Sequence, residues 1–169
     1  MAVPDNVSQR LVRLEAESAI RHLAARYMAL CDEPATDAAG PCFENLFTSD
    51  VVWEGIGRKA SSEFDRVEGR NALIAWFDSM RVPPKYAFNV HFLTSEAISV
   101  TEDRGRGTWV MLQLALRTTG EGELRIARVT IQFREVNEDW RISHFQTESL
   151  LRHDLPAGQI AAWIGQMES

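Results

Sequence analysis

The stretch RGTWVMLQLALRTTGEGELRIARVTIQF, residues 106–133, decides the fold class of this chain. Apolar and polar residues alternate on both sides of Gly120–Gly122, as they do in two strands joined by a hairpin turn. The same alternation is present in Tyr86–Val100 and in Trp140–Leu151, and Asn137–Asp139 supplies a second tight turn. The second half of the chain is therefore predicted to form a meander of four long antiparallel strands.

The first half of the chain has helical spacing instead. Val7–Cys31 repeats apolar residues at three- and four-residue steps, which predicts a long helix. Shorter helices are expected over Asp37–Phe47 and Gly69–Met80, with a short strand at Asp50–Ile56 and a polar loop at Arg58–Glu68. Helices followed by a meander indicate an α+β domain. Because long strands twist and curl, we expect the sheet to be curved.

The composition is that of one ordinary globular domain. The chain has 169 residues, of which 45% are hydrophobic and 25% are charged, and its net charge is −6. A negative balance argues against a nucleic-acid partner, which usually requires a basic face. No apolar run approaches the ~18–20 residues of a membrane helix, and the N-terminus lacks the apolar core of a signal peptide. We therefore expect a cytoplasmic protein whose two cysteines are free thiols.

Sequence motifs for metal and nucleotide binding are absent from the chain. It contains no HExxH pair, no GxGxxG or GxxxxGKS/T loop and no GxSxG elbow. We therefore expect neither a metal site nor a nucleotide-binding loop.

Four segments carry a family resemblance. They are AIRHLAARYMALCD at residues 19–32, LFTSDVVWEGIG at 46–57, HFLTSEAISV at 91–100 and NEDWRISHFQTES at 137–149. With these segments in this order, Leu11–Leu151 resembles the NTF2-like superfamily and, within it, the SnoaL-like group. The resemblance implies a cone of helices packed on the concave face of a curved, mainly antiparallel sheet, with an apolar cavity between them. It also implies a single SnoaL-like domain over residues 7–152, followed by a C-terminal tail over 153–169 with a short helix.

The resemblance further implies a catalytic pair. The chain is similar to scytalone dehydratases, bile-acid 7α-dehydratases and hexachlorocyclohexane dehydrochlorinases, which are lyases without cofactors. These families share an aspartate at the end of the first helix and a histidine on the first long strand, where Asp32 and His91 stand here. They imply that His91 is a general base, held and stabilised by Asp32. Tyr27 matches the Tyr-x4-Asp spacing of the bile-acid dehydratases, which implies a phenol that donates to the substrate, with core packing as the alternative.

The strand pattern leaves several side chains undecided. His91 lies on a mixed strand face that is either exposed to solvent or a cavity wall. On the last strand, Arg141 and His144 are expected on opposite faces, so only one of them reaches the cavity. The resemblance favours Arg141, as a cation for an oxyanion or a departing anion, and His144 is the alternative. Trp53 and Phe88 are candidates to stack on a flat or cyclic substrate, with core packing as the alternative for each.

The resemblance, together with these residues, implies a cofactor-free lyase that removes water or HX from a small cyclic, apolar substrate. An isomerase or a polyketide-cyclase-like enzyme would use the same residues, and the mass of the product separates the two. A third hypothesis is a ligand-binding or assembly module, in which Asp32 and His91 are apart or the cavity is filled. The apolar faces of the middle strands fit a homo-oligomer, either a dimer or a trimer.

Overall fold

A computed structural model describes residues 6–33, 43–57, 66–81, 83–160 and 162 of the chain. The described elements are, in chain order, α1 (Val7–Asp32), the 3-10 turn η1 (Glu44–Leu46), β1 (Phe47–Ile56), β2 (Val67–Glu68), α3 (Arg70–Arg81), β3 (Tyr86–Thr101), β4 (Arg104–Arg117), β5 (Gly122–Val136) and β6 (Asp139–Leu155). Among these helices, none is both long enough and apolar enough to cross a membrane.

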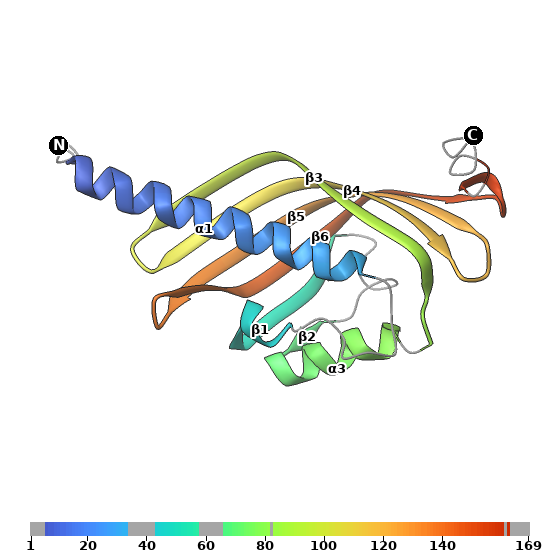
Figure 1. Cartoon of the computed structure of the whole chain (residues 1–169), viewed down its shortest axis with the longest axis horizontal. Coiled ribbons are helices and arrows are strands. Elements are labelled where there is room, and N and C mark those ends of the chain that lie inside the picture. Colours follow the sequence, from blue (N-terminus) through green and yellow to red (C-terminus); the bar gives the residue numbers. More distant parts are fainter. Residues whose placement is uncertain (1–5, 34–42, 58–65, 82, 161, 163–169) are drawn as a thin grey trace.

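The six strands form one open sheet in the order β2-β1-β6-β5-β4-β3. β1 runs parallel to β6, and all other neighbouring strands are antiparallel. In Figure 1 the long strands curve over α1, and α3 lies next to β2 at one end of the sheet. The predicted α+β class, with helices on the concave face of a curved, mainly antiparallel sheet, is confirmed.

Helix α1 begins at a capping box and ends at Asp32, the predicted partner of His91. The Asn6 side chain accepts a hydrogen bond from the Gln9 backbone N–H at 2.8 Å, and the Gln9 side chain accepts from the Asn6 N–H at 2.9 Å. These bonds satisfy two of the donors that a helix leaves open at its N-terminus. The helix runs on to Asp32, and its buried side chains are Ile20, Ala24, Tyr27 and Met28. The helix therefore delivers Asp32 to the concave side of the sheet.

The segment before β1 differs from the expected helix over Asp37–Phe47. Residues 37–42 lie outside the described residues, and Glu44–Leu46 form only a single 3-10 turn. Phe47 already belongs to β1, because it pairs with Ile142 of β6. The helix prediction is therefore wrong over its described end, where strand pairing overrides the local spacing of apolar residues. Of the predicted loop at Arg58–Glu68, residues 58–65 lie outside the description, and Val67–Glu68 pair with β1 as β2.

Two glycines of β4 leave room for large side chains that pack on the concave face of the sheet. A Cβ atom added to Gly105 on β4 would lie 2.3 Å from Cδ1 of Ile20 on α1. A Cβ atom added to Gly107 would lie 2.1 Å from the ring of Trp109. Real side chains do not come this close, so only glycine fits under the helix and under the indole ring. The approach of Ile20 to Gly105 is a point at which α1 packs closely on β4.

The C-terminal tail begins as part of the sheet. β6 continues through Leu155, which is paired with Gly122 of β5, so the strand extends beyond the expected domain boundary at residue 152. Leu155 and Ile160 are both buried. The short helix expected in the tail is described only at Gln159, Ile160 and Ala162, and the other residues from 161 onward lie outside the description.

Candidate active site

A cavity of about 610 Å³ lies between α1, α3 and the concave face of the sheet. This volume falls in the range of roughly 300–1,000 Å³ that is usual for small-molecule sites. One part of its wall is aromatic. The rings there come from both helices, from the sheet and from the residue before η1: Tyr27, Trp76, Phe77, Trp53, Phe145 and Phe43. The cavity can therefore enclose an apolar ring system.

The structure brings Asp32 and His91 together in the wall of this cavity. His91 Nδ1 lies 2.6 Å from Asp32 Oδ1, and the His91 backbone N–H donates to Asp32 Oδ2 at 3.0 Å. The two side chains are 21% and 12% exposed for Asp32 and His91, respectively. The mixed face of β3, which carries His91, is thus turned toward the cavity. Of the two alternatives for this face, solvent or cavity wall, the structure has the cavity wall.

The hydrogen bonds around Asp32 define the proton position on His91. Both carboxylate oxygens face donors, because Oδ2 accepts from the backbone N–H of His91 and Oδ1 lies 3.4 Å from the donating Nδ2 of Asn89. A carboxylate that only accepts must receive its ring contact from an Nδ1–H group. The neutral imidazole then carries its lone pair on Nε2, so this nitrogen is the one able to accept a proton as a general base. The arrangement corresponds to an oriented base with a carboxylate behind it.

Asn89 is a positioning residue that the sequence reasoning missed. Its Nδ2 also donates to the backbone carbonyl of Cys31 at 3.1 Å, and its Oδ1 accepts from Gln113 Nε2 at 2.7 Å. Asn89 therefore connects the last turn of α1 to β3 and β4 next to the Asp32–His91 contact. The signal that could have found it is its place two residues before His91, on the same face of the strand.

Tyr27 lies at the aromatic end of the cavity, with a side chain that is 3% exposed. Its hydroxyl accepts a hydrogen bond from Trp53 Nε1 at 3.3 Å. Burial, together with the neighbouring Cys31 thiol, raises the pKa of Tyr27 well above its ordinary value of 10.0. Burial also raises the pKa of Cys31, a free thiol as expected, to about 12. Both groups are therefore neutral near pH 7, and the Tyr27 hydroxyl can act as an uncharged donor.

Trp53 and Phe88 occupy different parts of the cavity wall. Trp53 is 5% exposed and stacks on Phe145, with ring centroids 5.7 Å apart and planes 5° apart. Phe88 also lines the cavity, but it is 37% exposed. Trp53 is therefore part of the packed aromatic wall, whereas Phe88 belongs to the rim.

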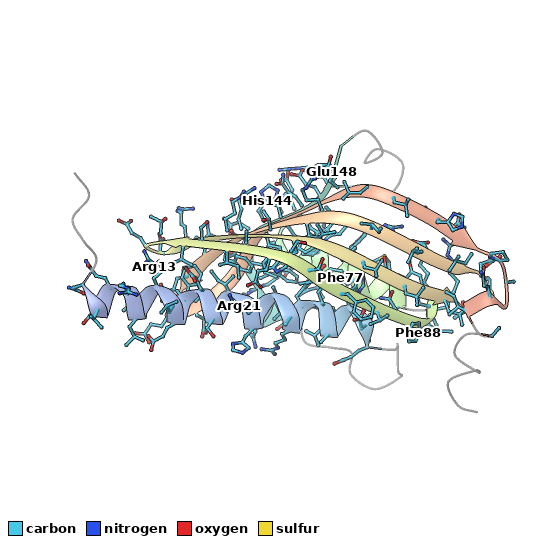
Figure 2. The ribbon with its side chains drawn as sticks, turned by 90° about the horizontal axis from the view of Figure 1, so that it is seen from above. Arg13, Arg21, Phe77, Phe88, His144 and Glu148 are labelled. Atoms are coloured by element: carbon cyan, nitrogen blue, oxygen red, sulfur yellow. The ribbon has the colours of Figure 1, made fainter. Side chains whose placement is uncertain are left out.

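Arg141 and His144 do not line the cavity, in contrast to the expectation that one of them would. Arg141 is paired with Arg134 and His144 with Gln132, both on the outer face of β5, while Ile142 and Phe145 fill the concave face. A β-bulge places one extra residue, Ser143, between these pairs and breaks the alternation of β6. Figure 2 shows His144 on the side of the sheet turned away from α1.

On that outer face, His144 belongs to a separate polar cluster. His144 Nε2 lies 2.8 Å from Glu54 Oε1, which also accepts from Gln146 Nε2 at 2.9 Å. Burial of Glu54 acts to raise its pKa, but hydrogen bonds from Gln146, Arg66 and His144 outweigh burial and lower the pKa to about 2. The carboxylate of Glu54 is thus held in the charged form by its partners, and His144 serves to satisfy it.

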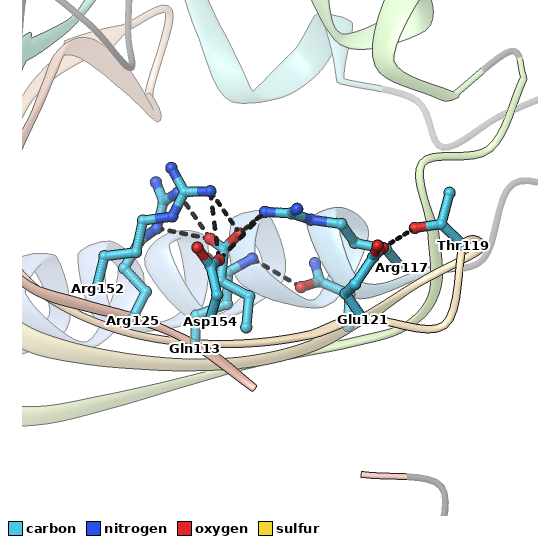
Figure 3. A network of polar contacts seen from close by, with 9 residues as sticks. Gln113, Arg117, Thr119, Glu121, Arg125, Arg152 and Asp154 are labelled. Carbon is cyan, nitrogen blue, oxygen red and sulfur yellow. Dashed lines mark hydrogen bonds and ion pairs between the residues drawn. The ribbon is translucent and has the colours of Figure 1, made fainter. Parts of the chain in front are cut away.

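The other end of the cavity carries a charged cluster that the sequence reasoning also missed. Glu123 is 1% exposed, and its Oε1 accepts from Arg125 Nε at 3.0 Å and from Arg125 Nη2 at 2.7 Å. Its Oε2 accepts from Arg117 Nη2 at 2.5 Å and lies 3.4 Å from Arg152 Nη2. Burial acts to raise the pKa of Glu123, but the arginines outweigh it and lower the pKa below its ordinary value. Figure 3 shows the guanidinium groups of Arg117, Arg125 and Arg152 approaching one another above the sheet.

The described residues contain no group of three or more His, Cys, Asp or Glu side chains that could hold a metal ion. The expectation of a cofactor-free protein stays a prediction.

An open, curved sheet with helices on its concave face and an apolar cavity between them is the NTF2-like fold. Within this class, the chain belongs to the SnoaL-like domain family, which matches residues 12–146. No curated protein matches the chain.

Solved structures share the fold at low sequence identity. A type 2 hexachlorocyclohexane dehydrochlorinase is 17% identical, with a TM-score of 0.69 and a match that covers 85% of this chain and 90% of that chain. A protein from Novosphingobium aromaticivorans named for scytalone dehydratase is 14% identical, with the same TM-score of 0.69 and coverages of 85% and 90%. An NTF2-like protein with a cystatin-like fold from the same species is 22% identical, with a TM-score of 0.64 and coverages of 88% and 92%.

Proposed function

We propose that the protein is a cofactor-free lyase that removes water or HX from a small cyclic, apolar substrate, with His91 as the general base. The observation that carries the proposal is the 2.6 Å contact between His91 Nδ1 and Asp32 Oδ1 in the wall of an apolar cavity. This contact and the open cavity argue against a pure assembly module, which requires neither. Two proteins of the same fold are named for a dehydrochlorinase and a dehydratase, which also supports elimination chemistry.

The reaction assigns one task to each group. His91 Nε2 takes a proton from a ring carbon, and the electrons of the broken C–H bond form a C=C bond with the neighbouring carbon. The leaving group departs with the electrons of its own bond. A halide leaves as the anion, and the His91 imidazolium then returns its proton to solvent; a hydroxyl leaves as water after taking a proton from the imidazolium or from solvent. Asp32 stabilises the imidazolium that His91 becomes. The Tyr27 hydroxyl donates a hydrogen bond to the leaving group or to an activating carbonyl oxygen.

Shape and polarity of the cavity support a cyclic substrate. Trp53, stacked on Phe145, offers a flat wall, and Phe88 lies at the rim. Flat rings bind such walls by stacking on them and by burying apolar surface away from water. Arg141 has no part in this proposal, because it lies outside the cavity wall.

The test is a screen of cyclic alcohols, ketones and halides, with the product identified by mass. Loss of water or HX supports a lyase, whereas a product of unchanged mass identifies an isomerase or a cyclase. His91→Gln is expected to lower turnover by about 10²–10⁴-fold, which is the usual contribution of a general base. His144→Gln is the matched control, because it removes a histidine on the outer face. Full activity of His91→Gln, or equal loss in both variants, overturns the role of His91.

The outer face of the sheet supports a homo-oligomer, dimer or trimer, as a further part of the proposal. Phe92, Leu112, Ile126 and Leu151 lie directly opposite one another across four strands. Phe92 is 50% exposed and Leu151 is 44% exposed, and a continuous apolar row on a surface commonly marks an interface. Phe92→Lys is expected to convert the protein to a monomer in light scattering. A wild-type protein that is monomeric at the same concentration contradicts this part.

A further inference from the structure

One row of polar side chains crosses the concave face of the sheet. His91 on β3 is paired with Gln113 on β4, Gln113 with Arg125 on β5, and Arg125 with Arg152 on β6. All four residues line the cavity. Because adjacent strands lie ~4.8 Å apart, Arg125 stands roughly 10 Å and Arg152 roughly 14 Å from His91, measured along the sheet. A single ligand can therefore touch the base at one end and a guanidinium group at the other.

Positive charge is concentrated at the arginine end of this row. The guanidinium groups of Arg117, Arg125 and Arg152 all lie within 3.4 Å of one buried carboxylate, that of Glu123. Asp154 also approaches the cluster, 3.5 Å from Arg152, but its side chain is 64% exposed. Water screens such an exposed carboxylate, so it offsets the arginines only weakly.

Crowding of cations around one carboxylate favours the binding of a further anion. Glu123 raises the pKa of Arg117, first through its hydrogen bond, while burial and the repulsion from the Arg152 guanidinium group act to lower it. The cluster also lies in the cavity wall, where Arg125 and Arg152 line the space that a ligand would fill. An anionic group of a ligand, placed there, would offset this repulsion and accept hydrogen bonds from guanidinium groups that the fold already holds in position.

We propose that Arg125 and Arg152 form a carboxylate subsite of the cavity, so that the substrate is a cyclic, apolar body carrying a carboxylate group. This inference rests on the proposed function, because it takes His91 as the reacting end of the row. The separation of roughly two strands between His91 and Arg125 suits a body of about two fused rings between the reacting carbon and the carboxylate. Hydrogen bonds from a guanidinium group to a carboxylate are charge-assisted and stronger than neutral ones, which gives the subsite its preference for an anion.

The whole-chain charge makes this subsite testable by binding. The protein carries a net charge of −6, so its long-range field repels anions. Preference for an anion over a neutral ligand of the same shape must then come from local groups. Naphthalene-2-carboxylate and naphthalene-2-carboxamide are such a matched pair, and equilibrium dialysis measures the affinity of each for the full-length protein.

We expect the wild-type protein to bind the carboxylate at least tenfold more tightly than the carboxamide, as one charge-assisted contact allows. Arg152→Gln should remove most of this preference and leave the carboxamide affinity within about twofold. Arg128→Gln is the matched control, because Arg128 lies on β5 but pairs with Glu148 on the outer face, where it is 57% exposed. It removes the same charge and should keep the preference.

Arg125→Gln is the second variant of the subsite. Because it leaves the buried Glu123 with fewer donors, it can fail to fold, so the result with Arg152→Gln is the one that tests the subsite. Equal affinity of the wild type for both probes, absence of carboxylate binding, or equal losses in Arg152→Gln and Arg128→Gln overturns the subsite. Failure of the lyase proposal is distinguishable. In that case the carboxylate preference persists while His91→Gln has no effect on turnover, whereas a failed subsite leaves elimination dependent on His91 and indifferent to Arg152.

Discussion

Replacing Asp32 by asparagine tests the proton position on His91 directly. In the wild type both oxygens of Asp32 accept, Oδ1 from the His91 ring at 2.6 Å and Oδ2 from the His91 backbone N–H at 3.0 Å. An asparagine has one oxygen and one NH₂ group. The backbone N–H of His91 can only donate, so it binds the side-chain oxygen of the new asparagine. The NH₂ group of the asparagine then faces Nδ1 of His91. We expect the ring to change tautomer, with Nδ1 accepting and the proton on Nε2.

The size of the effect follows from which nitrogen carries the lone pair. With Nε2 protonated, His91 presents a donor where the substrate proton should be accepted, so the general-base contribution is lost. That contribution is about 10²–10⁴-fold, or about 3–5 kcal/mol in the barrier. The folded state should lose less, about 1–3 kcal/mol, because a charged acceptor is removed and the introduced NH₂ group opposes the donating amide of Asn89.

Nitrogen-15 NMR of the histidine rings reads the tautomer without any substrate. The wild type should show His91 protonated at Nδ1 at a pH where the ring is neutral, and Asp32→Asn should show it protonated at Nε2. His144→Gln identifies the resonances of the outer-face histidine and should leave those of His91 in place. Asp32→Asn/His91→Gln should be no less active than His91→Gln alone, because the two residues act as a unit. An unchanged tautomer in Asp32→Asn, or additive losses in the double variant, refutes the reasoning.

Three further outcomes are expected. Gly105→Ala should destabilise the fold by about 1–3 kcal/mol in urea unfolding, because the new Cβ would lie 2.3 Å from Ile20, while Ser99→Ala at an exposed position of β3 should change it by under about 0.5 kcal/mol. The pKa of Glu54, about 2, lies below its ordinary 4.5, so the contribution of Glu54 to the free energy of unfolding is complete above about pH 4.5 and is lost as the pH falls toward 2. Glu54→Gln should therefore reduce the loss of stability between pH 4.5 and pH 2, as measured by urea unfolding. Cys31, with a pKa of about 12, should resist iodoacetamide at pH 8 in the native protein and react after unfolding, as peptide mass spectrometry can show.

The long elements were predictable because each repeats one pattern many times. Val7–Asp32 holds helical spacing over its whole length, and β4 and β5 hold a period of two, so single exceptions do not change the assignment. The segment before β1 is short, and there the local spacing of Phe43 and Phe47 fits a helix as well as a strand. Pairing of Phe47 with Ile142, 95 residues away in sequence, decides the outcome, and no local pattern contains that information.

Some residues of the candidate site could also be predicted from the sequence, and others could not. Asp32 and His91 could be singled out by the family resemblance, although their contact across 59 residues depends on the packing of α1 on β3. Arg141 and His144 could not be assigned, because a single extra residue at Ser143 inverts the face of everything before it. A bulge has no reliable sequence signature, so strict alternation predicted opposite faces where the structure has the same one.

Arg125 escaped notice for a related reason, and its position bears on how the cavity works. In the sequence, Arg125 and Arg128 look alike, as two arginines on one strand, and their odd spacing alone says only that they face opposite ways. Only the register across β4 and β3 shows that Arg125 shares a row with His91. His91 and Arg125 stand on β3 and β5, with only β4 between them, and two groups on one rigid sheet keep a fixed separation, whereas groups on loops would not. If a carboxylate is held at Arg125, the fixed separation between Arg125 and His91 therefore selects which ring carbon reaches His91. The register of the strands then determines the regiochemistry of the reaction.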